Sequence, residues 1–201
     1  MLQDYYSKRP LFGGAIASTF PNRFQDVSSI RQVPDHQEVF VDPVRDESLI
    51  FELLDLKHDV GDNESATWFL QDLATEQEAA GSMVIEQSGV IEAHMLCYRN
   101  IPAVVTTAVG QMGAARKGST KHCEVLQVYV ANLRLKEVTT DVLITAYEPI
   151  HINPLSESAK AVGAGFAVPA AQAGCMPMAE VFKLAVSSFK VNVWSLFGIV
   201  A

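Results

Sequence analysis

Three stretches of the chain carry apolar residues at helical spacing. Residues 47–58 follow Asp46 and residues 64–78 follow Asn63, and both preceding residues are of types that cap helices. Residues 178–190 place apolar side chains at the first position and again three, four, seven, eight and eleven positions later, as one face of an amphipathic helix does. The pattern therefore predicts three helices, two of them in the first half of the chain.

Other stretches have the composition of β-strands, rich in Val, Ile, Thr and aromatic residues. The first of them contains Gly13 and Gly14, whose small size permits a bulge or a close backbone approach. The last two are separated by a short turn at 138–140, which predicts an antiparallel hairpin. The predicted strands cover residues 11–18, 37–42, 82–86, 102–112, 123–136 and 140–148.

These elements predict an α+β fold in a single domain over residues 1–201. Helices segregated from a run of strands indicate an antiparallel sheet, and no internal repeat or break in composition divides the chain. Residues 19–36 are predicted as a loop or a single helical turn. Residues 149–177 form a long stretch rich in Ala, Gly and Pro, and we expect part of it to be mobile. Residues 194–198 are expected to pack against the last helix or cap it.

The composition is that of a folded, acidic protein. Hydrophobic residues make up 49% of the chain, enough for a real core. The formal net charge of −8 argues against a nucleic-acid binder and against attachment to anionic lipid by charge, since both need a basic surface. No apolar run has the length of a transmembrane helix. Residues 1–80 hold 15 acidic and 6 basic residues, which indicates a solvated face or a docking surface for a basic partner.

Targeting and redox signals favour a soluble protein of the cytosol or nucleus. The first ten residues lack the apolar core of a signal peptide, and they contain Asp4 and one serine, which argues against a transit peptide. The three cysteines, Cys97, Cys123 and Cys175, are odd in number and form no CxxC pair, which fits a reducing compartment.

The sequence lacks the common catalytic motifs. None of the five histidines lies in HExxH or four residues from another histidine, and neither GxSxG nor a phosphate-binding GxxxxGK[ST] loop is present. His122 and Cys123 are neighbours on a strand and point to opposite faces, so they cannot share a metal ion. We expect no cofactor and no metal. One alternative is a small hydrolase that uses His94 or His122 with a nearby carboxylate in a concave pocket.

Two clusters of charge have simple structural explanations. Asp55 and Asp59 are four residues apart on the polar face of the helix predicted over 47–58, where they are expected to be solvated. Arg116, Lys117 and Lys121 lie between predicted strands and are expected to form a soluble hairpin tip protected by lysine.

Residues 21–43, PNRFQDVSSIRQVPDHQEVFVDP, carry a more specific pattern. Pro34 stiffens the chain before Asp35, and Glu38 follows at the start of a predicted strand. A turn there would aim both carboxylates to one side, where they suit a Lys or Arg of a partner protein. The alternative from spacing alone is that Asp35 forms the turn and Glu38 is a solvated strand end. Alternation along the strand leaves Phe40 either exposed or in the core.

Four strings of the sequence resemble the Mog-type Ran guanine nucleotide release factors, small regulators of the Ran GTPase in nuclear transport. The strings are LFGGAI (11–16), DVSSIRQVPDHQEVFVDP (26–43), ESLIFELLDL (47–56) and SLFG (195–198). The match is most specific in the first third, where VPDxQEV follows LxGGA. It is looser through 80–148 and weak over 149–177.

The resemblance implies a fold and a set of contact residues. The family fold is an antiparallel β-sheet packed between helices, an α/β/α sandwich shared with the thylakoid PsbP protein, and it agrees with the α+β prediction. In the family, the Asp and Glu of the PDxQE motif are important for Ran binding, and the matching residues here are Asp35 and Glu38. Asp26 and Arg31 match other motif positions near the same surface.

The resemblance also implies a role. It indicates a monomeric regulator of the nucleus and cytoplasm, without catalytic residues of its own, that binds Ran and promotes guanine nucleotide release. A related alternative is that it stabilises nucleotide-free Ran, jointly with a Ran-binding protein. The alternative from the same fold is a PsbP-like accessory protein of photosynthesis. That alternative requires a transit peptide and an export signal, which residues 1–10 do not resemble.

Overall fold

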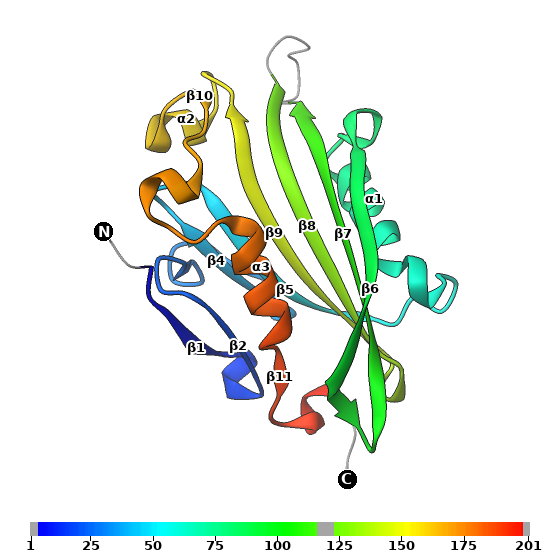
Figure 1. Ribbon diagram of the computed structural model, residues 1–201. Coiled ribbons are helices and arrows are strands. Elements are labelled where there is room, and N and C mark those ends of the chain that lie inside the picture. Colours follow the sequence, from blue (N-terminus) through cyan, green and yellow to red (C-terminus); the bar gives the residue numbers. More distant parts are fainter. Residues whose placement is uncertain (1–3, 116–122, 199–201) are drawn as a thin grey trace.

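The molecule is built around a large antiparallel sheet (Figure 1). The computed structural model describes residues 4–115 and 123–198. The strands are β1 (Tyr6–Leu11), β2 (Ile16–Pro21), β3 (Gln25–Asp26), β4 (Gln37–Asp42), β5 (Glu47–Asp55), β6 (Val84–Tyr98), β7 (Ile101–Ala115), β8 (Cys123–Leu135), β9 (Thr140–Ile152), β10 (Gly165–Phe166) and β11 (Lys190–Val191). The α-helices are α1 (Ser65–Glu76), α2 (Glu157–Val162) and α3 (Met178–Ser187).

The large sheet lies between two layers. Its strand order is β3-β4-β5-β9-β8-β7-β6, and β10 pairs with β9. α1 packs against β7 and β8 on one face, and α3 packs on the other face together with a small sheet of order β1-β2-β11. The predicted α+β architecture, an antiparallel sheet between helices, is confirmed. Within the described residues, no helix combines the length and the apolar character needed to cross a membrane.

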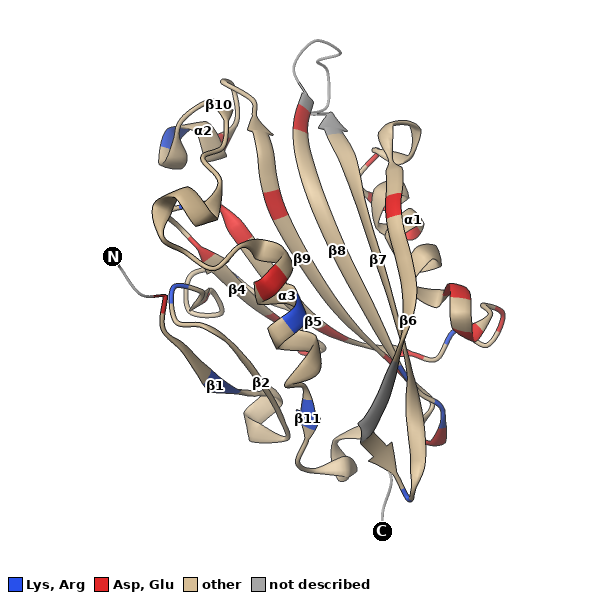
Figure 2. Cartoon of the chain, viewed as in Figure 1, with Lys and Arg blue, Asp and Glu red and all other residues tan. Residues whose placement is uncertain are grey.

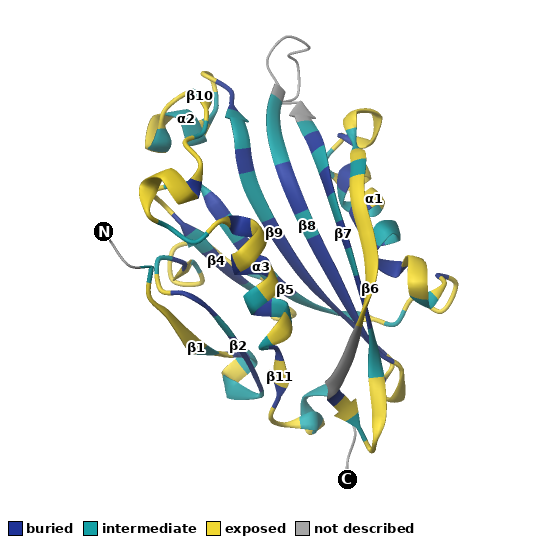
Figure 3. Cartoon of the chain, viewed as in Figure 1, coloured by how far each residue is buried: buried dark blue, intermediate teal, exposed yellow. Residues whose placement is uncertain are grey.

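Each face of the large sheet has its own apolar core, and buried positions follow one another along β8 and β9 (Figure 3). Val128 and Val130 of β8 pack with Leu70 of α1. Leu133 of the same strand belongs to the opposite core, with Val181 of α3. Because successive strand residues point to opposite faces, one strand supplies both cores. Burial on both faces explains why the central strands carry nearly continuous apolar runs.

The helix predicted over 47–58 is wrong, because most of this stretch is strand β5. It pairs with β4 on one side and β9 on the other. Every second residue from Glu47 to Phe51 is buried, while Leu54 packs against the opposite core. Apolar groups on both faces of a strand produce a spacing that resembles a helix. Asp46 has a φ of 55° in the turn before β5 and is not a helix cap.

The other two predicted helices are confirmed as α1 and α3. Asn63 does not cap α1, since it lies inside a 3₁₀ turn, Asp62–Glu64, that leads into the helix. Asp55 ends β5 and Asp59 lies in the turn that follows, so the two carboxylates share no helix, although both are exposed. Near the C-terminus a 3₁₀ turn, Trp194–Phe197, packs against the core beside α3, as expected.

The predicted strand over 11–18 is in fact the end of one strand, a turn and part of the next strand. β1 ends before the 3₁₀ turn Phe12–Gly14, and β2 follows it. Gly13 and Gly14 have φ of 66° and 88°, values that glycine adopts without steric cost. The paired glycines therefore make the hairpin turn rather than a bulge. The predicted turn at 138–140 is confirmed, with Thr139 in the left-handed region between β8 and β9.

Residues 149–177 contain the end of β9, then α2, β10 and the 3₁₀ turn Ala170–Ala173. Ser156 caps α2, since its Oγ accepts the N–H of Ala159 at 3.2 Å. Mobility within this stretch stays a prediction, as does the single domain over 1–201. The basic residues Arg116, Lys117 and Lys121, together with His122, lie outside the described residues.

Candidate functional site

The chain enters β4 through a tight turn that exposes Asp35. Gln37 donates its backbone N–H to the carbonyl of Pro34 at 2.9 Å, which closes a β-turn with Asp35 at its second position. Leu53 of β5 donates its N–H to the carbonyl of His36 at 2.9 Å, so the turn is fastened to the sheet. Asp35 itself is exposed. The turn expected at this place is confirmed, and it holds one carboxylate out to solvent.

Glu38 has a different environment, because it faces the small sheet. Its Oε1 accepts a hydrogen bond from the backbone N–H of Phe12 at 2.6 Å, and the residue is half-buried. Phe12 has a φ of 49°, a conformation that non-glycine residues adopt rarely. Glu38 is therefore neither a freely solvated strand end nor wholly available to a partner. One of its oxygens secures the turn of the β1–β2 hairpin.

Asp26 and Arg31 lie on the edge strand β3 and on the connection that leads from it to β4. Asp26 Oδ1 accepts the backbone N–H of Ser28 at 2.8 Å, which shapes the turn after β3. The backbone N–H of Arg31 is bonded to the carbonyl of Val27 at 3.0 Å. Both side chains are exposed. With Asp35 they form an exposed, charged edge of the large sheet, which we call the acidic corner together with Glu38.

Gln37 and Glu52 form a hydrogen-bonded pair beside the acidic corner that was not predicted. Glu52 Oε1 accepts a hydrogen bond from Gln37 Nε2 at 2.8 Å and lies 3.3 Å from His36 Nε2. Gln37 and Glu52 are paired across β4 and β5. This neighbourhood can be found from the sequence only when residues 47–55 are recognised as a strand.

A cluster of buried phenylalanines supports the acidic corner. Phe40 lies two residues from Glu38 in β4, and its ring packs edge-on against Phe20 of β2 at 4.8 Å. Phe20 also lies 5.8 Å from Phe51 of β5. The guanidinium of Arg9 stands 5.3 and 5.4 Å from the centres of the Phe20 and Phe40 rings. Phe40 is thus a core residue, and a rigid base of this kind lowers the entropy lost on binding.

The acidic corner offers fixed charge. Figure 2 marks acidic positions along β4 and β5. A carboxylate held on a fixed turn makes strong, charge-assisted hydrogen bonds with a Lys or Arg. Arg31 provides one cation at the same edge, so the surface also has a positive element that can help to orient a partner.

The hydrolase alternative depends on residues that the structure does not place in a site. His122 lies outside the described residues, and only the backbone of His94 is described. His58 is exposed, and the ring of His151 packs against Phe166 at 5.1 Å. Between residues 4 and 115 and between 123 and 198, no group of three or more His, Cys, Asp or Glu side chains is arranged to hold a metal ion.

Comparison with known proteins identifies similar sequences along most of the chain. The family model described as "Mog1: Ran-interacting Mog1 protein" matches residues 9–149. A Danio rerio protein named Ran guanine nucleotide release factor is 35% identical over 156 residues, which cover 75% of this chain and 82% of that protein. A Dictyostelium discoideum protein named "Probable ran guanine nucleotide release factor" is 31% identical over 200 residues, 98% of each chain.

Comparison with solved structures identifies the same fold. The crystal structure of the Saccharomyces cerevisiae Ran-binding protein Mog1p superimposes with a TM-score of 0.67 at 23% identity. The match covers 97% of this chain and 100% of that one. The structural match therefore includes α3, which lies outside the residues that the family model matches, and the small sheet, of which β11 lies outside them.

Proposed function

The chain belongs to the family of Ran-interacting Mog1 proteins, and on this premise we propose that it binds the Ran GTPase and promotes guanine nucleotide release in nuclear transport. The observation that carries the proposal is the exposed Asp35, held by a hydrogen-bonded turn at the start of β4. A carboxylate placed in this way is ready to pair with a cationic side chain without further ordering.

The residues of the acidic corner have different roles in this proposal. Asp35 meets a Lys or Arg of Ran directly. Glu38 uses one oxygen to hold the Phe12 turn and adds negative charge beside the contact. Asp26 and Arg31 border the contact and orient the GTPase as it docks.

Release follows from differential binding. A regulator expels a nucleotide only when it binds the emptied or loosened GTPase better than the loaded one. GTPases of this class hold the nucleotide with backbone N–H groups, a lysine and Mg²⁺. The acidic corner engages basic residues of Ran and favours the conformation in which those nucleotide contacts are weakened, so the regulator needs no bond-making chemistry.

We also propose a cellular role as a regulator in nuclear transport. The chain acts as a monomeric regulator rather than a catalyst and works in the nucleus and cytoplasm, alone or jointly with a Ran-binding protein. Relatives named nuclear import proteins in Schizosaccharomyces pombe and Saccharomyces cerevisiae support a transport role.

A pull-down with Ran in three loading states tests the proposal. Immobilised full chain is incubated with GTP-loaded, GDP-loaded and nucleotide-free Ran, and the bound fraction is measured. We expect the nucleotide-free form to be retained most strongly. Equal retention of all three forms would contradict the release mechanism, and retention of none would remove Ran as the partner.

A further inference from the structure

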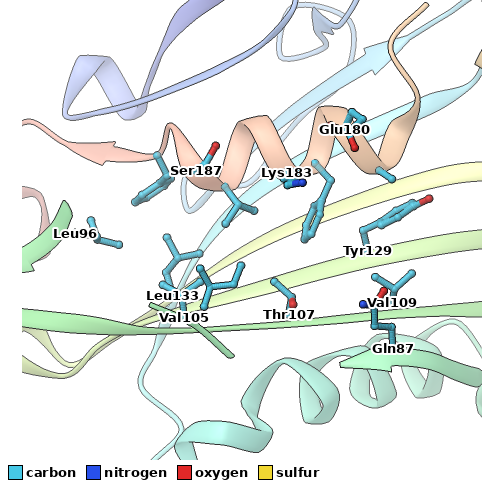
Figure 4. Close-up of a pocket in the computed structure, with 15 residues that line it drawn as sticks. Gln87, Leu96, Val105, Thr107, Val109, Tyr129, Leu133, Glu180, Lys183 and Ser187 are labelled. Carbon is cyan, nitrogen blue, oxygen red and sulfur yellow. The ribbon is translucent and has the colours of Figure 1, made fainter. Parts of the chain in front are cut away.

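A long groove separates α3 from the outer strands of the large sheet (Figure 4). Its volume is about 720 Å³, and ligand sites typically measure roughly 300–1,000 Å³. Phe182 and Val186 line the α3 wall. The floor is formed by alternate residues of β6, β7 and β8, namely Ile91, Val105, Thr107, Val109, Tyr129 and Leu133. The groove is thus mainly apolar and is distinct from the acidic corner, which lies at the other end of the strand order.

The outer wall of the groove has a notch at Gly89. Gln87 and Ile91 line the groove, and Gly89 lies between them in the same row of β6. Its cross-strand partner, Thr107, lines the groove as well. A Cβ placed on Gly89 would meet Thr107 Oγ1 at 3.9 Å, an ordinary contact, so the space in front of it is open. The missing side chain therefore leaves room on the groove face for a side chain of a neighbouring segment.

β6 also presents an unpaired edge. It ends the strand order, and no strand of the described chain pairs with its outer side. Register shifts at Ile85/Gln87 and at Ala93/Cys97 leave a regular stretch between them. The exposed residues 87–91, QSGVI, contain neither the lysine nor the proline that commonly protects an edge strand. Such an edge is a template for another strand.

One end of the groove is acidic. The hydroxyl of Tyr129 donates to Glu148 Oε2 at 3.1 Å. Glu86 Oε2 accepts a hydrogen bond from Gln127 Nε2 of β8 at 2.6 Å, and Gln127 points to the same face of the sheet as Tyr129. Glu180 of α3 stands above Tyr129 at this end (Figure 4), and Lys183 is the basic residue of the lining. Arg23 and Arg45 offset part of the charge of Glu148. Glu86 and Glu180 are therefore the carboxylates that favour a basic side chain on whatever occupies this end of the groove.

We propose that the groove and the free edge of β6 bind an extended segment of a partner protein, apolar at alternate positions and basic at the Glu180 end. The backbone of the segment pairs with the free edge of β6, and its inward side chains fill the space over Gly89 and the apolar floor. Because the acidic corner lies beyond β4, this second partner and the GTPase can be bound together.

A labelled peptide tests the proposal directly. The probe is a synthetic peptide of alternating Val and Thr that ends in two Lys, titrated with the full chain and followed by fluorescence polarisation. We expect saturable binding that Gly89→Val weakens about tenfold or more, because the new side chain fills the notch. Ser88→Val is the matched control, since it places the same side chain on the opposite face of β6, and it should bind as the parent does. Equal binding by the Gly89→Val variant and the parent would overturn the proposal.

Two further probes give readouts that do not depend on a variant. A peptide with N-methyl groups at every second residue cannot donate backbone hydrogen bonds along one of its edges. Two such peptides are compared, one methylated at the odd residues and one at the even residues, and we expect one of the two to lose binding. A peptide ending in two Glu should bind less tightly than the Lys peptide. The proposal would be overturned if neither the N-methyl groups nor the exchange of Lys for Glu altered binding. It would also be overturned if the groove bound a fatty acid, tested with laurate, and did not bind the peptide. Gly89→Val should leave release of nucleotide from Ran unchanged, so this test is separate from that of the proposed function.

Discussion

The Glu38 carboxylate accepts a hydrogen bond from the backbone N–H of Phe12, and this 2.6 Å contact joins the large sheet to the hairpin of the small one. Glu38 therefore has two separable properties. It supplies an acceptor that holds the Phe12 turn, and it supplies negative charge at the acidic corner. Substitution by Gln removes only the charge, whereas substitution by Ala removes both.

Glu38→Ala is expected to lower the free energy of unfolding by about 1–3 kcal/mol, because it leaves the partly buried N–H of Phe12 without its partner. Glu38→Gln should retain most of the stability, since the amide oxygen can accept the same bond. Urea unfolding followed by tryptophan fluorescence measures both changes. Equal losses in the two variants would show that the hydrogen bond is not what Glu38 contributes to the fold.

Asp35→Asn should leave the free energy of unfolding within about 0.5 kcal/mol of the parent, because the side chain is exposed. The same variant should weaken binding to nucleotide-free Ran, measured by calorimetry, because a neutral amide makes weaker hydrogen bonds with Lys or Arg. Glu76→Gln, on α1 at the other face of the sheet, is the matched control. Unaltered affinity in the Asp35→Asn variant would exclude a charge-based contact at this position.

A buried ion pair stabilises the end of the β8–β9 hairpin. Arg134, whose side chain is 2% exposed, donates to both oxygens of Asp141 at 2.9 and 3.0 Å. The hydrogen bonds from Arg134 to Asp141 hold the pKa of the guanidinium above its ordinary value. Arg134 also donates to the carbonyls of Lys57 and Val60 before α1.

Asp141→Asn should lower the free energy of unfolding by roughly 3–5 kcal/mol, because it removes the fully buried counter-charge of the guanidinium and leaves the partly exposed Asp62 as its acidic partner. The control is Glu157→Gln, which removes an exposed ion pair with Lys160 and should change stability by less than about 1 kcal/mol. Chemical denaturation of both variants provides the comparison. A small effect of Asp141→Asn would mean that the carboxylates near Arg134, such as Asp62, already compensate its charge.

Stability should also depend on the ionisation of Glu148. Burial raises the pKa of this carboxyl above its ordinary value, although the hydroxyl of Tyr129 opposes the shift. A carboxyl with a raised folded-state pKa favours the folded state below its unfolded pKa, and that contribution is lost as pH rises through the folded pKa. The stability of Glu148→Gln relative to the parent should therefore increase as pH rises from about 4. Denaturation curves at several pH values test this, and a difference that is constant or falls with pH would contradict it.

The positions of helices α1 and α3 were predictable because each has one apolar stripe and one solvated side. β5 was not, because Phe51 and Leu54 are apolar residues on opposite faces of a strand that is covered on both sides. Gly13 and Gly14 correctly indicated a backbone conformation that other residues rarely adopt, since both have positive φ. Their spacing alone did not distinguish a bulge from the turn that the structure contains.

The acidic corner was predictable in part. The turn before β4 follows from Pro34, and the exposure of Asp35 follows from the turn. The bond between Glu38 and Phe12 joins residues 26 positions apart, and it depends on how the small sheet docks, which no local pattern encodes. Glu52 was missed for a related reason, since its place beside Gln37 exists only in the register between β4 and β5.

The rate at which Ran loses a fluorescent guanine nucleotide in the presence of the full chain measures whether the acidic corner promotes release. We expect accelerated release by the parent chain and by the Glu76→Ala variant, which serves as the control. Asp35→Ala, confirmed as folded, should bind the loosened GTPase more weakly by about 2 kcal/mol or more, roughly a thirtyfold loss that slows release correspondingly. Release that proceeds equally fast with the parent and with the Asp35→Ala variant would contradict the claim that the exposed Asp35 carboxylate is what engages Ran.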